Sequence, residues 1–494
     1  MRPVSLVALT GLLLSPGLWL GPGLDSAVYT LAGVVIREGR MPYLDLFDHK
    51  PPGLYILNAA GQMVLPWLDP WVVSWLLTFG FAAATVLVVD LLLRRRMSAS
   101  ASFAMTGLCL IGIACHAIAY GGGLTESFAI LPLVAALWAV STLSPGWRTS
   151  AEVGVLASIA CLFSVHAVPV AAVLGLASIA RARPAEMARR ATAGVVAAAA
   201  IPAAVLIWLA ARGALGDAID QIAVYNISYR ASSSGFGYVL LAACLILGCL
   251  AVPVGIAVVR MVREPRSFDR LRWICVAWVV VETATLAYEN RLFLHYLILL
   301  VPPLVVLAGP GFEWLVDTMR SPRRGSRNLA ILLSALTAGI LAVSGAAVVG
   351  LTAVTMSGAG TEQAVTDATS AWLDAHTPAS ARVFLWGNDT YIYLVANRPS
   401  YDSHVYQLPM VTAGYWTPDK TAAILAAWTA APPDAIVETP ATVPMFRPQP
   451  DPPTLPNYDT LAPLRAFVRA NYRLEATFGS GGDIEDIYVL IPTG

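Results

Sequence analysis

Residues 70–96, PWVVSWLLTFGFAAATVLVVDLLLRRR, decide the fold class of this chain. The stretch 71–93 is almost entirely apolar, and three arginines, Arg94 to Arg96, follow it directly. A helix of about 20 apolar residues is long enough to cross a bilayer core of about 30 Å. Arginines that directly follow such a helix are typical of its cytoplasmic end. The segment therefore predicts one membrane crossing and its direction.

The composition of the whole chain extends this prediction. Its 494 residues are 57% hydrophobic and only 13% charged, with a mean hydropathy of +0.67. These values exclude an ordinary soluble globular protein and indicate a polytopic α-helical membrane protein. We expect the lipid bilayer as a partner and no nucleic acid. The formal net charge of zero hides an uneven distribution of arginine along the chain.

Eleven apolar stretches predict eleven transmembrane helices. They are residues 4–20, 71–93, 101–118, 126–143, 151–166, 168–182, 191–211, 237–259, 272–288, 293–311 and 329–353. The segment 151–182 allows either two short crossings or one long tilted helix, and two crossings agree better with the charge pattern. The first stretch also allows a second interpretation as a signal peptide, since Arg2 precedes a short apolar run.

Arginines gather in alternate loops. One set is Arg94, Arg95, Arg96, Arg148, Arg181, Arg183, Arg189, Arg190, Arg260, Arg263, Arg266, Arg270, Arg272, Arg320, Arg323, Arg324 and Arg327. The intervening loops hold only Arg37, Arg40, Lys50, Arg212, Arg230 and Arg291. The positive-inside rule places the first set and the N-terminus in the cytoplasm of a plasma-membrane protein. Residues 21–70, 119–125, 212–236 and 289–292, and everything after about 354, then face outward.

The tail differs in character from the rest. We divide the chain into a transmembrane domain, 1–354, and a small extracytoplasmic α/β domain, 355–494. Mixed amphipathic and extended patterns predict helices near 361–376, 417–430 and 459–471, and strands at 382–386, 434–438, 474–479 and 486–491. The outward loop 212–236 is predicted to contain a short surface helix.

The first outward loop carries the main candidate site. Lys50, one of only two lysines, follows Tyr43, Asp45, Asp48 and His49 and precedes two prolines. An ammonium at a membrane surface, held by prolines, suits an anionic ligand. Each residue also has an ordinary explanation, because turn carboxylates before proline and a lysine that reaches the interface are common.

Asp25 opens the same loop and also has two interpretations. It follows Gly21-Pro22-Gly23 and is either a carboxylate at a helix terminus or a catalytic group.

Two later segments add polar residues on the same side. Glu126 begins the fourth stretch, where a carboxylate either favours the helix N-terminus or faces a functional cavity. Glu282, inside the ninth stretch, raises the same question. The segment 288–296 brings Arg291, His295 and Tyr296. Arginine binds phosphate bidentately, although an interfacial arginine beside aromatic residues is the alternative. His116 and His166 lie in apolar stretches and are interpreted as core residues.

The residues resemble those of a known superfamily. The loop from Asp25-Ser26 through Gly39-Arg40-Met41-Pro42-Tyr43 to Asp48-His49-Lys50-Pro51-Pro52 resembles the first outward loop of GT-C glycosyltransferases. The most similar group contains the family 39 protein O-mannosyltransferases and the lipid A aminoarabinose transferases. Residues 291–303 resemble their late segment with arginine, histidine-tyrosine and a proline pair. The tail beginning at 383–387 resembles the soluble domain of bacterial members.

The resemblance implies transfer of a sugar from a polyprenyl phosphate on the outer face of the membrane. It places the essential carboxylate at Asp25, the lysine that contacts the donor phosphate at Lys50, and a second acid near Glu126. Many relatives have two adjacent acids where this chain has Asp25 and Ser26. No cofactor is implied with certainty, and a divalent metal is left open. The acceptor is a glycan, a lipid or a protein.

The chemistry suits the residues independently. A lipid-phosphate sugar already carries its leaving group, so the expected reaction is a single inverting displacement. Asp25 would act as the general base, and Lys50 with Arg291 and His295 would stabilise the phosphate. The arginine- and alanine-rich composition suggests a high-GC genome, for which mannose or arabinose is the expected donor sugar.

Other functions remain as alternatives. The chain has no P-loop and no dinucleotide fingerprint. A secondary transporter or a flippase of envelope precursors is the main rival, although such proteins usually show internal repeats with broken helices at the midplane. A polymerase or ligase that uses lipid diphosphates is nearer in chemistry. The third alternative is a protein that binds a lipid-linked glycan without catalysis.

Overall fold

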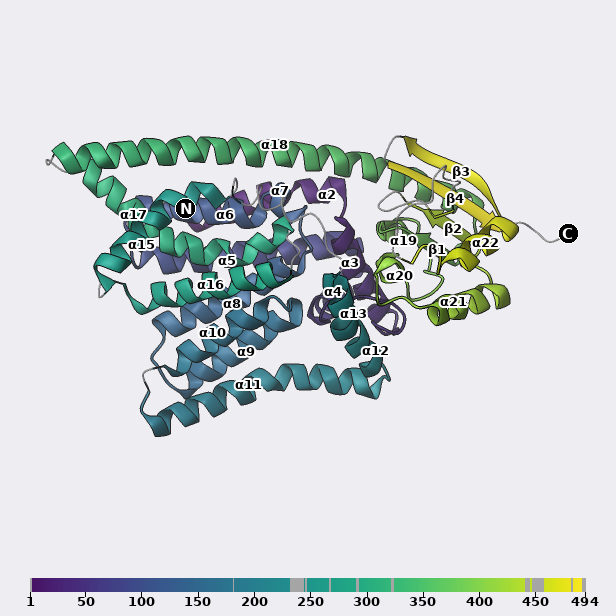
Figure 1. The fold of residues 1–494 in the computed structure, drawn as a ribbon, viewed down its shortest axis with the longest axis horizontal. Helices are drawn as coiled ribbons and strands as arrows, with labels where there is room; N and C mark the ends of the chain where they lie inside the picture. Colours follow the sequence, from purple (N-terminus) through teal and green to yellow (C-terminus); the bar gives the residue numbers. More distant parts are fainter. Residues whose placement is uncertain are drawn as a thin grey trace.

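The computed structural model of this chain shows a bundle of long helices with a small α/β domain at one end (Figure 1). It describes residues 2–180, 182–231, 244, 247–265, 268–289, 293–320, 324–439, 445–446, 457–480 and 483–490. The bundle is formed by α1 (Arg2–Leu14), α2 (Pro16–Leu20), α5 (Pro70–Arg94), α6 (Ala99–Ala114), α8 (Thr125–Thr142), α9 (Trp147–Phe163), α10 (Ala167–Ile179), α11 (Pro184–Ala211), α15 (Ala251–Arg263), α16 (Arg270–Glu289), α17 (Val301–Met319) and α18 (Arg324–His376).

Shorter helices gather at the end of the bundle that carries the α/β domain (Figure 1). They are α3 (Leu24–Arg37), α4 (Gly53–Val64), α7 (His116–Ala119), α12 (Leu215–Ile219), a π-helix (Asp220–Val224), α13 (Tyr225–Ala231) and a 3₁₀-helix (Leu294–Leu299). A second 3₁₀-helix, Gly248–Leu250, precedes α15. The short helix predicted within 212–236 is therefore confirmed.

The prediction of a multi-pass helical membrane protein is confirmed. Within the described residues, six helical segments are long and apolar enough to cross a bilayer. They are Arg2–Leu20, Pro70–Arg94, Thr125–Thr142, Pro184–Ala211, Arg270–Glu289 and Gly325–His376. The segment 151–182 forms two helices, α9 and α10, as the charge pattern favoured. The predicted stretch 237–259 is described only in part.

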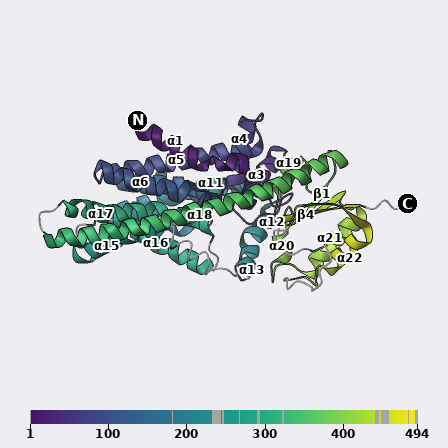
Figure 2. The same cartoon turned by 90° about the horizontal axis from the view of Figure 1, so that it is seen from above.

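Two predicted helices have different bounds in the structure. The stretch 293–311 was predicted as one helix, but α17 begins at Val301 and ends at Met319. Pro302 and Pro303 lie in its first turn, where a missing N–H costs no helical hydrogen bond, so they start the helix. The last stretch continues as one helix to His376, because no proline or capping signal interrupts it. The predicted domain boundary at 354/355 therefore falls inside α18, which crosses the bundle and reaches the α/β domain (Figure 2).

The first helix is an integral part of the bundle. Asp90, buried in α5, forms ion pairs with Arg2 and, at 2.9 Å, with Arg94. Trp75 of α5 donates its indole N–H to the Leu14 carbonyl at 2.9 Å. A buried carboxylate left without a partner is costly, so these contacts bind α1 to α5. The packing favours a membrane helix over the alternative of a signal peptide.

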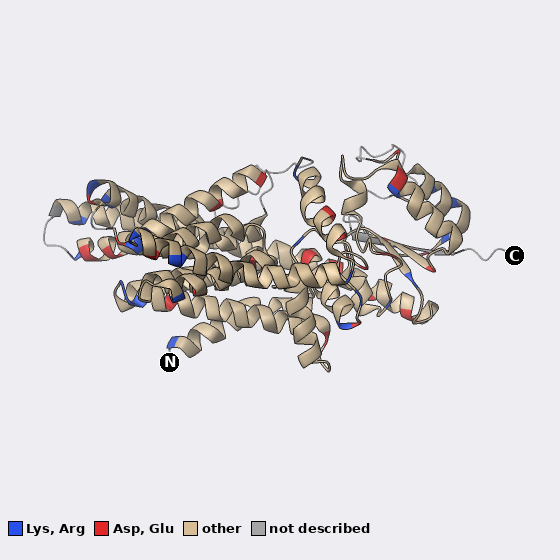
Figure 3. Ribbon diagram, turned by 90° about the horizontal axis from the view of Figure 1, so that it is seen from below, with Lys and Arg blue, Asp and Glu red and all other residues tan. Residues whose placement is uncertain are grey.

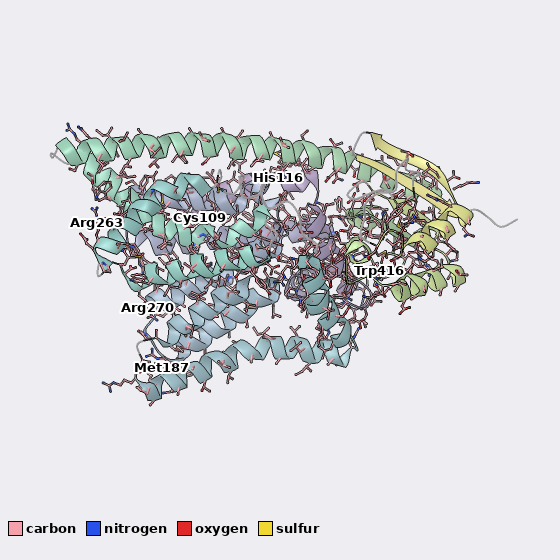
Figure 4. The ribbon with its side chains drawn as sticks, viewed as in Figure 1. Cys109, His116, Met187, Arg263, Arg270 and Trp416 are labelled. Carbon is pink, nitrogen blue, oxygen red and sulfur yellow. The ribbon has the colours of Figure 1, made fainter. Side chains whose placement is uncertain are left out.

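Charged residues gather at the two ends of the molecule (Figure 3). The ribbon positions of lysine and arginine, blue in Figure 3, concentrate at the end opposite the α/β domain, where Arg263 and Arg270 lie (Figure 4). The long central part of the bundle is nearly free of charge along its described length. The concentration of lysine and arginine at one end agrees with the alternation of arginine-rich loops in the sequence. The assignment of that end to the cytoplasm stays a prediction from the positive-inside rule.

A glycine-rich turn fixes the end of the bundle where the site lies. Gly121, Gly122 and Gly123 all have positive φ, which glycine adopts without strain. A Cβ on Gly121 would lie 2.7 Å from the Cα of Gly17, so α2 and this turn touch through their backbones. The turn leads directly into α8 and so sets the position of Glu126.

The α/β domain contains a four-stranded sheet in the order β1-β2-β4-β3. The strands are β1 (Val383–Trp386), β2 (Ala435–Glu438), β3 (Tyr472–Ser480) and β4 (Asp483–Leu490). The first two are parallel and fully buried, and the other pairings are antiparallel. The helices are α19 (Tyr391–Val395), α20 (Leu408–Val411), α21 (Pro418–Ala430) and α22 (Ala462–Asn471). All four predicted strands are confirmed, with small differences at their ends.

The close approach at Gly121 generates a stability prediction. Gly121→Ala would place a Cβ in a left-handed conformation against the Gly17 backbone, and we expect a loss of about 1–3 kcal/mol in stability. The control is Gly80→Ala, because Gly80 is helical and nothing lies within 4 Å of its added Cβ. Thermal unfolding in detergent checks both variants. Equal melting temperatures for Gly121→Ala and Gly80→Ala would contradict the proposed packing.

Candidate functional site

Asp25 lies in the first turn of α3, where a helix N-terminus favours a carboxylate. Gly23 is the N-cap, and Gly21, with φ of +73°, turns the chain from α2 into this helix. The Asp25 carboxylate is exposed, and no group in the described residues hydrogen-bonds to it. It is therefore free to take a proton from a ligand.

Ser26, the residue where many relatives have a second acid, points away from Asp25. It is fully buried and donates its hydroxyl to the Gly122 carbonyl at 2.7 Å. A Cβ on Gly123 would lie 2.8 Å from the Ser26 Cβ, so the turn leaves no space for a longer side chain here. Serine at this position joins α3 to the glycine turn.

The loop between α3 and α4 is held by its own polar groups. Asp45 accepts a hydrogen bond from the Met41 backbone N–H at 2.7 Å. Tyr43, with φ of +71°, donates its hydroxyl to the Lys50 carbonyl at 2.8 Å. Neither Asp45 nor Tyr43 lines the cavities described below, and their role in substrate binding stays a prediction.

Asp48 joins the loop to the α/β domain. Its buried carboxylate accepts hydrogen bonds from the hydroxyls of Tyr55 in α4 and, at 2.9 Å, of Tyr406. His49 lies 3.3 Å from the same carboxylate. Burial alone would raise the pKa of Asp48, but the His49 and Tyr55 contacts outweigh it and the pKa lies below its ordinary value. Asp48 is therefore an anion that is already satisfied by protein groups.

Lys50 lies in the wall of a cavity, and the pKa of its ammonium group is raised. Burial opposes its charge, but the Tyr296 hydroxyl and the carboxylates of Glu126 and Asp25 outweigh burial and raise the pKa of Lys50 above its ordinary value. Its ammonium lies 6.0 Å from the centre of the Tyr296 ring. No hydrogen-bond acceptor for this ammonium occurs in the described part of the chain. A charged, unsatisfied ammonium is suited to bind an anion.

Glu126 lies behind this surface, 1% exposed. One of its carboxylate oxygens accepts hydrogen bonds from Thr125 at 2.9 Å and from Ser164 at 3.1 Å. The other lies 3.9 Å from His295 and has no hydrogen-bond partner within the described chain. His166 packs on Tyr296 with ring centres 4.4 Å apart. The structure thus brings Glu126, His295 and Tyr296 together near Lys50, while their roles stay predictions. Arg291 lies outside the described residues.

Two cavities meet at Asp25. The first, the lysine cavity, has a volume of about 310 Å³, and its walls include Asp25, Tyr29, Asp48, His49, Lys50, Tyr229, Tyr296, Asn388 and Tyr406. The second, the acidic cavity, has a volume of about 410 Å³, and its walls include Asp25, His116, Tyr120, His295, Glu362, Gln363, Asp389 and Tyr391. Asp25 thus lies between the two cavities, and Lys50 lines only the first of them.

A third cavity of about 560 Å³ lies among α1, α2, α6, α17 and α18. Its walls are almost entirely apolar, and His116 of α7 lies in its wall and in that of the acidic cavity. Figure 4 places His116 beside α7 and α2, below α18. The core interpretation of His116 from the sequence was incomplete, because this ring borders two cavities.

Several residues of the site carry little signal in the sequence. Tyr406 and Asn388 come from the α/β domain, and Glu362 and Asp389 come from α18 and from the turn before α19. Nothing local distinguishes them from other polar residues of the tail. His166 was also interpreted as a core residue, and its contact with Tyr296 depends on the packing of α10 against α8 and the 3₁₀-helix 294–299.

No group of three or more His, Cys, Asp or Glu side chains placed to hold a metal ion occurs in the described ranges. The carboxylate of Asp25 borders the lysine cavity together with the Lys50 ammonium, and it borders the acidic cavity together with Glu362 and Asp389. Since these side chains are not grouped as metal ligands within the described residues, no step proposed below uses the divalent metal that the resemblance left open.

Comparisons with known proteins and solved structures identify the fold. No protein-family model and no curated protein matches the sequence. Among solved structures, ArnT from Cupriavidus metallidurans bound to undecaprenyl phosphate aligns with a TM-score of 0.62 and 14% identity, covering 99% of this chain and 98% of that one. The same protein in the apo state aligns with a TM-score of 0.60 and 13% identity, covering 98% of this chain and 97% of that one.

A second solved protein also aligns. The oligosaccharyltransferase of Archaeoglobus fulgidus, tethered with an acceptor peptide, gives a TM-score of 0.50 and 12% identity, covering 98% of this chain and 74% of that one. ArnT and this oligosaccharyltransferase both belong to the GT-C superfamily. The chain therefore has a GT-C fold, as the resemblance predicted.

The Asp48 contacts generate a prediction about the α/β domain. Tyr406→Phe removes one hydrogen bond to a buried carboxylate, and we expect a loss of about 1.5–3 kcal/mol in stability. Tyr401→Phe is the control, since the Tyr401 hydroxyl donates only to the Ala431 carbonyl at the surface of the same domain. Thermal unfolding and limited proteolysis between α18 and β1 measure the difference. A loss in Tyr406→Phe no larger than in Tyr401→Phe would disprove the role of Asp48 as the link.

Proposed function

We propose that this protein with a GT-C fold is a membrane glycosyltransferase that moves a sugar from a polyprenyl-phosphate donor to a hydroxyl group of a cell-envelope acceptor. One observation carries the proposal. The exposed Asp25 carboxylate lies where two cavities meet, and one of the cavities presents the unsatisfied ammonium of Lys50. The fold shared with ArnT, which was solved with bound undecaprenyl phosphate, supports the class of donor.

In the proposed reaction, the donor phosphate lies in the lysine cavity. Lys50 neutralises the negative charge of the phosphodiester and stabilises the polyprenyl phosphate that leaves. Tyr296 and His49, in the walls of the same cavity, offer a hydroxyl and a ring nitrogen to the donor. A charge-assisted contact of this kind is worth most where the protein excludes water.

Asp25 is the proposed general base. It takes the proton of the acceptor hydroxyl as the acceptor oxygen bonds to the anomeric carbon and the bond from that carbon to the phosphate oxygen breaks. A single displacement of this kind inverts the configuration at the anomeric carbon. The base must lie within about 2.6–3.2 Å of the acceptor oxygen. The place of Asp25 in the walls of both cavities suits that requirement.

Glu126 has an indirect role in this proposal. It is buried and lines neither cavity, and it faces Lys50 and His295 from within the bundle. Its carboxylate contributes, after Tyr296, to the raised pKa of Lys50, and its second oxygen lies 3.9 Å from His295, beyond hydrogen-bond distance. We therefore assign Glu126 to positioning rather than to direct contact with the reacting atoms.

Transfer by purified protein in nanodiscs tests the proposal. A panel of radiolabelled polyprenyl-phosphate sugars, including mannose and arabinose, would be offered with membrane acceptors. We expect transfer from one donor, and Asp25→Asn should reduce it by at least about 100-fold, as loss of a general base typically does. Glu38→Gln, which removes an exposed acid at the other end of α3, is the control. Donor binding without transfer in the wild type would instead identify a glycan-binding protein.

Lys50→Ala separates binding from chemistry. It removes a contact to a charged group, and we expect polyprenyl phosphate to bind about 10–100 times more weakly, in line with about 1.5–3 kcal/mol for such a bond. The control is Lys420→Ala, which removes the other lysine, on α21 in the α/β domain. Binding to immobilised protein measures both. Equal affinities for Lys50→Ala and the wild type would remove Lys50 from the donor site.

The raised pKa of Lys50 predicts a flat pH dependence. A pKa above the ordinary value of 10.5 means that the protonated form is favoured and is lost only at still higher pH. A polyprenyl-phosphate sugar is a phosphodiester with no proton to lose near neutrality. We expect its affinity to change less than about twofold from pH 7 to pH 9. A tenfold fall that is absent in Lys50→Ala would show that the ammonium titrates in this range.

A further inference from the structure

The α/β domain contributes three described residues to the lysine cavity, and one of them has an unused polar group. The three are Asn388, Tyr406 and Leu408. Leu408 is apolar, and the Tyr406 hydroxyl already donates to Asp48 at 2.9 Å. The Oδ1 atom of Asn388 is buried and has no hydrogen-bond partner within the described chain. The Asn388 amide is therefore the polar group that this domain can offer to a ligand in the cavity.

The chemistry of this amide limits what can satisfy it. A buried polar atom without a partner is costly and rare, and a bound ligand is one way to satisfy it. The amide carries an acceptor oxygen and two N–H donors, and its terminal torsion is broad, so either side can turn to the cavity. A phosphodiester has no hydrogen to donate and would leave the oxygen unsatisfied. A sugar hydroxyl both donates and accepts, so it suits the amide better.

The backbone around Asn388 is fixed by the sheet. Asn388 follows the carboxyl end of β1, which is paired in parallel with β2, and ligands commonly bind outside such strand ends. The Gly387 carbonyl accepts from the Gln407 backbone N–H at 3.0 Å, and the Trp386 carbonyl accepts from that of Thr439 at 2.8 Å. A Cβ on Gly387 would collide with the Thr439 hydroxyl. The end of β1 therefore holds the amide in a defined place.

The same contacts relate the amide to the proposed phosphate site. Tyr406, next to the residue that bonds the end of β1, holds Asp48, and Lys50 is two residues further along that loop. The cavity volume of about 310 Å³ lies at the small end of the range of about 300–1,000 Å³ typical of small-molecule pockets. With the phosphate at Lys50 and the anomeric carbon near Asp25, a single sugar ring faces the remaining walls, which include Asn388.

We propose that Asn388 is a specificity-determining residue that hydrogen-bonds a hydroxyl of the donor sugar, while Lys50 binds the donor phosphate. This inference rests on the proposed glycosyltransferase function and assigns recognition of the sugar to the α/β domain. A donor sugar without that hydroxyl leaves the amide unpaired. A site built to hydrogen-bond a hydroxyl rejects an analogue that lacks it, so the amide restricts which sugars are transferred.

Binding of lipid phosphates with and without a sugar tests the inference. Undecaprenyl phosphate and its mannose, arabinose, glucose and galactose derivatives would be offered to the protein in nanodiscs without acceptor. For Asn388→Ala we expect at least one sugar derivative to bind about 5–20 times more weakly, while undecaprenyl phosphate changes less than about twofold, since only the sugar loses a partner. Lys50→Ala should weaken all five ligands. Asn471→Ala is the control, because Asn471 lies on α22 of the same domain and lines neither the lysine cavity nor the acidic cavity.

Deoxy sugars identify the contact itself. The most tightly bound derivative would be compared with its monodeoxy analogues, each of which lacks one hydroxyl. In the wild type one analogue should bind about 5–20 times more weakly than its parent, and in Asn388→Ala the same analogue should lose less than about twofold, because its partner is already absent. Asn388→Asp retains an acceptor oxygen and should preserve the wild-type ratio of parent to analogue. Melting temperatures check the folding of both variants.

Binding and transfer together separate the inference from the proposed function. If Asn388→Ala weakens undecaprenyl phosphate as much as every sugar derivative, or weakens none of them, the inference is overturned, and transfer by the wild type would still support the transferase. Additive losses for every deoxy analogue in Asn388→Ala would also overturn it. Sugar-dependent binding that changes in Asn388→Ala, with no transfer from any donor, would support the contact and overturn the proposed function.

Discussion

The buried carboxylate of Asp48 is the interaction on which the candidate site depends. A buried charge is tolerated only when other groups satisfy it, and here Tyr55 of α4 and Tyr406 of the α/β domain do so. The same carboxylate therefore holds the first loop against both the bundle and the α/β domain. Lys50 is two residues further along this loop, so its position beside Tyr296 follows from the contacts of Asp48.

A second constraint aligns the acids of the site. The backbone contact of Gly17 with Gly121, and the hydrogen bond from Ser26 to Gly122, join α2, α3 and the turn before α8. Asp25 and Glu126 are distant in the sequence, and this contact places both at one end of the bundle. Ser26, where many relatives have an acid, is part of that packing and lines neither the lysine cavity nor the acidic cavity.

The proposed reaction needs a positive group and a base, and the two cavities present them on different sides of the site. A leaving phosphate requires a positive group, while removal of a proton from an acceptor hydroxyl requires a base. Lys50 borders only the lysine cavity, and Glu362 and Asp389 border only the acidic cavity. Asp25 borders both. The α/β domain contributes walls to each cavity, and the long continuous helix α18 joins this domain to the bundle.

The sequence by itself determined the membrane class, most helices, the four strands and the loop that carries Asp25 and Lys50. These features are local, because apolar runs, arginine clusters and alternating strands depend on neighbouring residues. Only the tertiary structure decided that Asp45 serves its own loop and that His116, Glu362, Asp389 and Tyr406 reach the cavities. The cavity contacts join segments that are far apart in the sequence, and packing between helices, rather than any local pattern, brings those segments together.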